Sequence, residues 1–317
     1  MRHIDRRDFL KAAGLASALP ALADRKRNLK IGHTGITWPA PRPPAADGAP
    51  PSGRGPAGAQ RRVDPAWIEG IVKDISSLGF YGLELFSFQI QGMEANGGMA
   101  PLIEKYNLPL ISAYGGPNLM DSEQRKENIA QAIEWGKLLK KYGGKVVTIG
   151  PNGVRRDSYN FKEHKDDIIT TLNEYGKALA GIGLTGCLHQ HTGTCIESRD
   201  ETYAVMEAVD TRYVKFGPDI GQLQKGGSDP VQVVKDFLPI VNHMHLKDYS
   251  GGEYFVGYCP LGQGKVNIPA ILDMMDGRAM AGMIMVELDG GPRMPMTALE
   301  TATIAKSYLE KQGVAFR

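Results

Sequence analysis

The sequence predicts an α/β fold, a single-domain (β/α)₈ barrel in which eight strands alternate with eight helices. Three observations support this prediction. Apolar runs of strand length recur along the chain, and stretches with helical periodicity separate them. The strand runs are continuously apolar, which is typical of strands that are covered on both faces. The 317 residues, 42% of them hydrophobic, suit one large core. A doubly wound open sheet is the alternative, but no glycine-rich phosphate-binding motif follows the first strand.

The expected strands and helices follow one another in strict order. The strands cover residues 29–35, 81–86, 108–114, 145–149, 184–189, 214–219, 240–246 and 283–288. The helices cover residues 64–78, 101–106, 122–142, 162–182, 199–209, 230–237, 268–275 and 296–312. The first helix is the best marked, because Asp64 suits an N-cap, Pro65 suits the first turn and Gly79 follows the last apolar position.

The first 23 residues predict an export signal that is not part of the fold. Two consecutive arginines lie in Asp5–Lys11, an apolar stretch runs from Ala12 to Leu22, and Ala21–Ala23 suits a signal peptidase. The alternative is a frayed helix with two arginines. The stretch is too short to span a bilayer as a helix. We therefore expect a twin-arginine signal peptide at residues 1–23, a mature barrel at residues 24–317, and a periplasmic or secreted protein without membrane insertion.

Residues 39–62 are rich in Pro, Gly and Ala and show no helical or strand periodicity. A linker between domains is one interpretation. We favour a long loop after the first strand, because the segment before it is too short to form a domain. In a barrel such a loop lies on the face where sites form, a position suited to a lid.

Charge and cysteine content limit the classes of partner. The chain has 37 Lys and Arg and 35 Asp and Glu. Residues 1–23 contain four basic and two acidic residues, so the mature chain keeps 33 of each and has no net charge. This balance gives no electrostatic reason to expect nucleic acid or a membrane surface as partner. The three cysteines match no zinc motif. Cys187 and Cys195 could pair outside the cytoplasm, but small buried residues are the simpler interpretation.

Four apolar segments end in metal-binding side chains, namely His189, Asp219, His245 and Glu287. Such a set suits one divalent cation where parallel strands converge. Glu287 ends an Ile-Met-Val run, where a buried acid without a partner is costly and a metal is the simplest partner. For Asp219, an N-cap or turn carboxylate is the alternative.

Two histidine pairs, His189 with His191 and His243 with His245, share a strand face because their members are two residues apart. The later residue of each pair lies nearer the mouth of a barrel. This geometry favours His245 over His243 as a ligand, and by the same argument His191 over His189. His243 is expected to form a hydrogen bond inside the barrel.

The chain resembles the xylose isomerase-like TIM-barrel superfamily of sugar isomerases and epimerases, and within it the inosose dehydratases. Six motifs across nearly all of the mature chain carry the resemblance: Gly82–Leu85, His189–Gly193, Asp219–Gln222, His243–Asp248, Leu261–Gly264 and Val286–Glu287. In that superfamily Glu, Asp, His and Glu side chains hold one Mn²⁺, Co²⁺, Mg²⁺ or Zn²⁺. The resemblance therefore implies one such cation on His189, Asp219, His245 and Glu287. His189 replaces the glutamate of the epimerases, as in the inosose dehydratases, and His191 is left to contact the ligands or the substrate.

The resemblance also implies α-proton chemistry on a keto-sugar or keto-cyclitol, with the cation stabilising an enediolate. Glu287 or a histidine, His189 among them, takes the proton, and a second group protonates a leaving hydroxyl or the other carbon. Lys247 stabilises negative charge, unless it is a solvated loop lysine. The expected substrate contacts are Glu84, His33, Trp38, His191 and Gln222. Two departures, His189 for glutamate and Gln222 for the histidine of many relatives, argue against simple two-glutamate epimerisation. For Glu84 the alternative is a structural carboxylate at the mouth.

These observations favour a metal-dependent isomerase, epimerase or dehydratase that acts on a free or glycosidic keto-sugar. Export argues against a phosphorylated substrate. A non-catalytic periplasmic sugar-binding protein on the same barrel is the alternative. An apurinic endonuclease is a remote third, because it needs further metal ligands and a basic groove. A homo-oligomer is compatible with the sequence.

Overall fold

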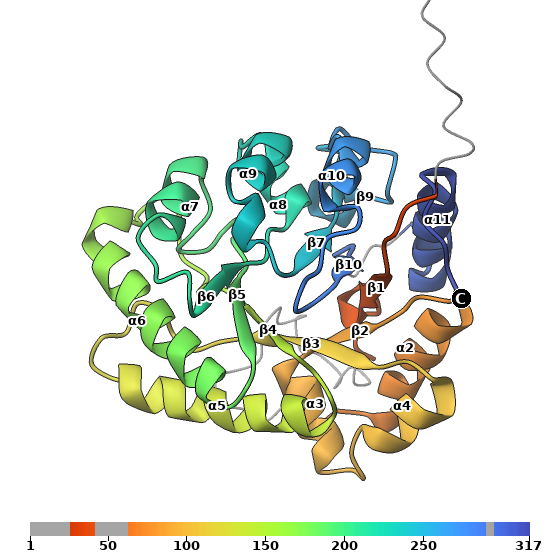
Figure 1. The fold of residues 1–317 in the computed structure, drawn as a ribbon, viewed down its shortest axis with the longest axis horizontal. Helices are drawn as coiled ribbons and strands as arrows, with labels where there is room; N and C mark the ends of the chain where they lie inside the picture. Colours follow the sequence, from red (N-terminus) through yellow and green to blue (C-terminus); the bar gives the residue numbers. More distant parts are fainter. Residues whose placement is uncertain (1–25, 42–62, 290–294) are drawn as a thin grey trace, which may run out of the picture.

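Eight parallel strands form the barrel that the sequence predicts (Figure 1). The computed structural model describes residues 26–41, 63–289 and 295–317. The strands are β1 Ile31–Thr34, β2 Leu83–Phe86, β3 Leu110–Gly115, β4 Val146–Ile149, β5 Thr185–Leu188, β6 Val214–Phe216, β7 Met244–Leu246 and β10 Ile284–Val286. Their order is β6-β5-β4-β3-β2-β1-β10-β7, and every neighbouring pair is parallel. Parallel bridges Phe216–Val241 and Asp219–His245 join the two ends of the sheet, so the predicted fold class is confirmed.

Helices surround the strands and cover the outside of the barrel (Figure 1). They are α2 Pro65–Ser77, α3 Ser87–Glu94, α4 Ala100–Tyr106, α5 Arg125–Lys141, α6 Phe161–Gly181, α7 Arg199–Met206, α8 Ile220–Lys225, α9 Pro230–Asp236, α10 Ile268–Met275 and α11 Ala298–Lys311. In the part of the chain that the structure describes, 3₁₀ turns cover Gly35–Thr37, Leu238–Ile240 and Phe255–Gly257. The first expected helix begins as predicted, because the Asp64 side chain accepts a hydrogen bond from the Ala66 amide and Pro65 is its first residue.

Two helices and one hairpin were not predicted. Helix α3 follows β2 directly, and its buried positions include the polar Gln89, which breaks the apolar period. Helix α8 has only six residues and depends on Asp219 as its N-cap. The segment after β7 forms an antiparallel hairpin of β8 Asp248–Tyr249 and β9 Tyr258–Cys259, where the sequence predicted a loop. The expected strand 240–246 is wrong at its start, because Pro239 lies in a 3₁₀ turn and the strand begins at Met244.

The remaining expectations concern the signal peptide, the long loop, the cysteines and membrane insertion. The expected signal peptide and residues 42–62 of the expected loop lie outside the described residues. Residues 39–41 belong to neither a helix nor a strand. Cys187 and Cys195 are buried and free, as the simpler interpretation predicted. Among the described residues, no helix combines the length and apolar content needed to span a bilayer.

Candidate metal and substrate site

Strands β5, β6, β7 and β10 bring the four expected metal ligands to one end of the barrel. His189 directly follows β5, Asp219 begins α8, His245 lies within β7 and Glu287 directly follows β10. Candidate ligand atoms of His189, Asp219 and His245 all lie within 4.8 Å of one another. His189 Nε2 is 3.9 Å from Asp219 Oδ2, and His245 Nδ1 is 2.8 Å from Glu287 Oε2. All four side chains are at most 5% exposed, so the group is shielded from solvent.

Asp219 serves two purposes with its two oxygens. Oδ1 accepts hydrogen bonds from the amides of Gly221 (2.9 Å) and Gln222 (3.0 Å), which caps α8. Oδ2 faces the centre, where Lys247 Nζ lies 2.9 Å away and His189 Nε2 lies 3.9 Å away. The N-cap and the ligand interpretations of Asp219 are therefore compatible.

Two nitrogens at this centre are buried without a hydrogen bond, which is rare in folded proteins. They are the ring nitrogens of His189, which have no partner in the described part of the chain. The ring nitrogens of His245 lie 2.8 Å from carboxylate oxygens, Nε2 from Glu84 and Nδ1 from Glu287. A divalent cation would accept lone pairs from two imidazoles and from Asp219. Because imidazole suits transition metals such as Zn²⁺ better than Mg²⁺, the two histidines favour a transition metal.

Lys247 is fully buried and contacts three carboxylates. Its Nζ lies 2.9 Å from Asp219 Oδ2, 2.5 Å from Glu287 Oε1 and 3.0 Å from Asp289 Oδ2. Burial lowers the pKa of the Lys247 ammonium, but the charges of Asp219, Asp289 and Glu287 outweigh burial and hold that pKa well above its usual value. Lys247 is therefore a fixed positive charge inside the site, not a solvated loop residue.

Burial and neighbouring charges also set the protonation of the other groups. Burial holds the pKa of His189 well below its usual value, so its imidazole is neutral, which is the form that binds metals. Burial alone would raise the pKa of Glu287, but the positive charges of His245 and Lys247 outweigh burial and hold that pKa well below its ordinary range. Glu287 is therefore a carboxylate at neutral pH.

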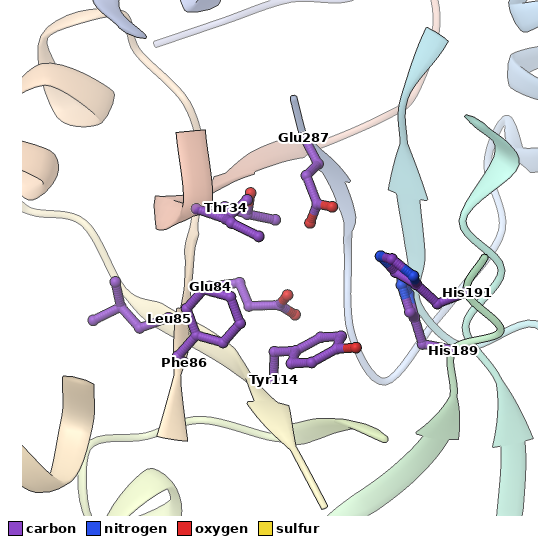
Figure 2. Close-up of a pocket in the computed structure, with 9 residues that line it drawn as sticks. Thr34, Glu84, Leu85, Phe86, Tyr114, His189, His191 and Glu287 are labelled. Atoms are coloured by element: carbon purple, nitrogen blue, oxygen red, sulfur yellow. The ribbon is translucent and has the colours of Figure 1, made fainter. Parts of the chain in front are cut away.

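A cavity of about 170 Å³ opens beside this centre (Figure 2). Its lining residues are Thr34, Ile36, Glu84, Leu85, Phe86, Tyr114, His189, His191 and Glu287. Glu84 and Glu287 point into the space between the aromatic side chains and the two histidines. Phe86 and Tyr114 meet edge to face with ring centroids 5.4 Å apart and form an apolar wall. The cavity therefore combines an apolar surface with a few polar groups, which is typical of small-molecule sites.

His191 and Gln222 form one hydrogen-bonded unit at the edge of the cavity. The amide nitrogen of Gln222 lies 2.8 Å from His191 Nε2, and Gln222 Oε1 accepts from the Thr192 hydroxyl (2.7 Å). His191 Nδ1 lies 2.7 Å from the Thr192 carbonyl oxygen, which can only accept. His191 Nδ1 therefore carries the proton, and both of its nitrogens are engaged by protein groups.

The structure does not bring His33 and Trp38 to this cavity, although the sequence analysis expected them to line it. His33 is 1% exposed, and its ring centroid lies 5.1 Å from those of Trp38 and Phe80. The Trp38 indole donates to Asp74 Oδ2 at 2.8 Å. Both rings pack in the layer between β1 and the helices that follow it.

Sequence reasoning missed the apolar wall and one carboxylate. Tyr114 and Phe86 each lie near the end of an expected strand, which is the position of cavity residues in a barrel, but an aromatic residue there is equally typical of the core. Asp289 follows Glu287 by two residues. Because side chains two residues apart on an extended chain point to the same side, this spacing was a signal that both carboxylates could reach Lys247.

Comparison with known proteins places the chain in a family. The family model described as "Xylose isomerase-like TIM barrel" matches residues 72–308. The chain belongs to the xylose isomerase-like TIM-barrel family. The model of the twin-arginine translocation pathway signal sequence matches residues 3–23, which confirms the expected kind of signal and supports export. Both resemblances seen in the sequence are therefore confirmed.

Curated relatives include inosose dehydratases. The protein of that name from Clostridium botulinum (strain Alaska E43 / Type E3) is 21% identical over 272 residues, which are 78% of this chain and 90% of the relative. The one from Mesomycoplasma hyopneumoniae (strain 7448) is 26% identical over 235 residues, or 65% of this chain and 77% of the relative.

Solved structures of the same fold include a probable dehydratase and an epimerase. The probable 3-DHS dehydratase AsbF from Bacillus anthracis superposes with a TM-score of 0.68 at 15% identity, over 89% of this chain and 99% of its own. The IOLI protein with a binding zinc atom gives 0.67 at 15% identity, over 90% and 98%. The 3-keto-D-glucoside 4-epimerase YcjR from E. coli gives 0.61 at 15% identity, over 90% and 98%. At these identities the similarity shows the fold.

Proposed function

We propose that this protein is a divalent-metal-dependent isomerase, epimerase or dehydratase that acts on a small keto-sugar or keto-cyclitol. One observation carries the proposal: candidate ligand atoms of His189, Asp219 and His245 converge within 4.8 Å, and Glu287 lies between them and the adjacent cavity. The inosose dehydratase relatives, and the epimerase and dehydratase of the same fold, support the same class of reaction.

In this proposal His189, Asp219 and His245 hold the cation, and Glu287 is the fourth ligand. The ion in the IOLI structure is zinc. The two imidazoles here suit zinc, and the two carboxylates also suit manganese. When bound, the cation would supply positive charge that stabilises the negative charge developing on a carbonyl oxygen as the α-proton leaves.

Glu287 is the group best placed to take that proton. It lines the cavity and is ionised, because His245 and Lys247 hold its pKa low. His189 lines the same cavity as a neutral imidazole and is the second candidate. Lys247 lies 2.5 Å from Glu287 and positions its carboxylate, while its charge offsets negative charge in the site.

The cavity supports a neutral, ring-shaped substrate. Its lining contains no Lys or Arg among the described residues, so no side-chain cation in the lining favours a phosphate group. The Phe86 and Tyr114 rings offer a surface for the C–H face of a sugar or cyclitol ring. Export supports a substrate met in the periplasm or outside the cell, where sugar phosphates are scarce.

A hydrogen-exchange experiment tests the proposal. The mature protein, loaded with Zn²⁺, Mn²⁺ or Co²⁺, is incubated in D₂O with a panel of ketoses, inososes and 3-keto-glycosides, and NMR follows deuterium at carbon. We expect exchange next to the carbonyl of at least one compound, lost on chelation and restored by the ion. Tight binding of a sugar without exchange or turnover across the panel would instead support a sugar-binding protein.

A further inference from the structure

Glu84 lies in β2, across the barrel from His245, and both of its carboxylate oxygens lie close to polar protein groups. Its Oε2 accepts a hydrogen bond from the Thr148 hydroxyl at 2.7 Å and lies 3.0 Å from His243 Nε2. Its Oε1 lies 2.8 Å from His245 Nε2. The side chain is 2% exposed, so protein groups determine its orientation.

The direction of these hydrogen bonds follows from a backbone amide. The Met283 N–H, which can only donate, points at His243 Nδ1 at 3.2 Å. His243 Nδ1 is therefore an acceptor, and the ring proton is on Nε2, where it is donated to Glu84. Thr148 and His243 both donate to Oε2, so this oxygen is an acceptor. The other oxygen, Oε1, faces His245.

His245 can bind a metal through only one nitrogen. Its Nε2 faces Glu84, and its Nδ1 faces Glu287 Oε2. The other oxygen of Glu287 contacts Lys247, which also contacts Asp219. The proposed ligands therefore converge on the Nδ1 side. We propose that Glu84 is a positioning residue that holds the Nε2–H of His245 and so directs the Nδ1 lone pair at the cation. This inference rests on the proposed metal-dependent function.

Two other roles for Glu84 fit the structure less well. Glu84, His243 and His245 are themselves grouped closely enough to suggest a second metal site. However, His243 Nε2 carries a proton that it donates to Glu84, because its Nδ1 accepts from the Met283 amide, so His243 has no lone pair to offer an ion there. A direct substrate contact is the other role, but each Glu84 oxygen already has a protein partner. A carboxylate behind a histidine ligand fixes the tautomer and orients the ring.

Glu84→Gln tests the inference, because an amide cannot satisfy all three neighbours. If its oxygen faces His245, its NH₂ opposes the His243 N–H. If its NH₂ faces His245, Nε2 must become the acceptor, and the proton moves to the nitrogen that should bind the ion. We expect Glu84→Gln to weaken Zn²⁺ and Co²⁺ binding about 10- to 100-fold, measured by competition with a chelator. Glu69→Gln makes the same chemical change in helix α2, where Glu69 pairs with Lys105 outside the site, and should leave the affinity within twofold.

A second measurement does not depend on any variant. Ring ¹⁵N–¹H correlation spectra of the zinc-loaded mature protein should show His245 protonated at Nε2 and carrying the ion on Nδ1. A proton on Nδ1 would overturn the inference even if Glu84→Gln failed to fold. Unchanged metal affinity in folded Glu84→Gln, with or without a higher KM, would also overturn it and leave the proposed function intact. If the wild-type protein bound neither ion, the proposed function itself would fail.

Discussion

Replacing Lys247 by Met should expose how strongly the site depends on a positive charge. The ammonium is fully buried and lies within 3.0 Å of carboxylate oxygens of Asp219, Glu287 and Asp289, the last of which is 19% exposed. Methionine fills a similar volume but leaves these carboxylates without their shared cation. Removing one partner of a buried ion pair typically costs about 3–5 kcal/mol. We expect a loss of that size in the free energy of unfolding, measured in urea with a chelator present.

A divalent ion should return more stability to Lys247→Met than to the wild type. In the wild type the ion competes with the ammonium for Asp219 and Glu287, whereas in the variant it is their main source of positive charge. An ion at 100 times its dissociation constant stabilises a protein by about 2.7 kcal/mol. The tighter binding expected in the variant should therefore restore a large part of the loss when urea unfolding is repeated with Zn²⁺ or Mn²⁺.

Lys225→Met is the matched control. Lys225 Nζ lies 4.7 Å from the Tyr258 ring centroid, the same distance as Lys247 Nζ, but it donates to the Val256 carbonyl oxygen. Its replacement should change the free energy of unfolding by about 0.5 kcal/mol, as surface substitutions do, with no added ion dependence. The electrostatic reasoning would be refuted if Lys247→Met unfolded like the wild type in chelator, or if the ion restored no more stability to it than to the wild type.

Three further predictions concern the proton acceptor, a buried histidine and the apolar wall. Glu287→Gln should slow deuterium exchange about 10²- to 10⁴-fold while the ion stays bound; full activity would remove Glu287 from the mechanism. Burial lowers the pKa of His33 to about 4, so the unfolded chain takes up a proton first as pH falls, and stability is lost from about pH 6.5 downward. Urea unfolding should show that His33 lowers the free energy of unfolding of the wild type by about 2 kcal/mol between pH 7 and pH 5. His33→Gln should lose this part of the pH dependence, and an unchanged pH dependence would contradict the prediction. Phe86→Ala should raise KM roughly tenfold without changing metal affinity, and a parallel fall in metal affinity would show that the ring supports the ligands instead of the substrate.

The fold was predictable because each strand is an apolar run and most helices carry their own periodicity. Helix α2 shows this best, since Ile68, Ile71, Val72 and Ile75 are all fully buried at helical spacing. Helices α3 and α8 could not be predicted in this way. Helix α3 buries the polar Gln89, and the six residues of α8 begin where the Asp219 side chain accepts hydrogen bonds from two backbone amides, which an apolar pattern does not contain.

The convergence of His189, Asp219, His245 and Glu287 was also predictable, because strand ends in a barrel meet at one mouth. The contacts that decide each residue's role were not. Whether Lys247 is solvated or paired depends on carboxylates from two distant segments, Asp219 after β6 and the pair Glu287 and Asp289 after β10. Spatial neighbours determine such charge partners, and the sequence around Lys247 does not indicate them.

Asp219 shows why a structural and a functional interpretation of one residue need not compete. An N-cap requires one side-chain oxygen near the amides of the first turn, and a metal ligand requires one oxygen at the centre. A carboxylate has two, and here Oδ1 meets the amides of Gly221 and Gln222 while Oδ2 faces Lys247 and His189. The cap fixes the side chain, so the same hydrogen bonds that begin α8 also aim Oδ2 at the centre. The short helix after β6 is thus part of the site, because it holds a proposed ligand in place before any ion arrives.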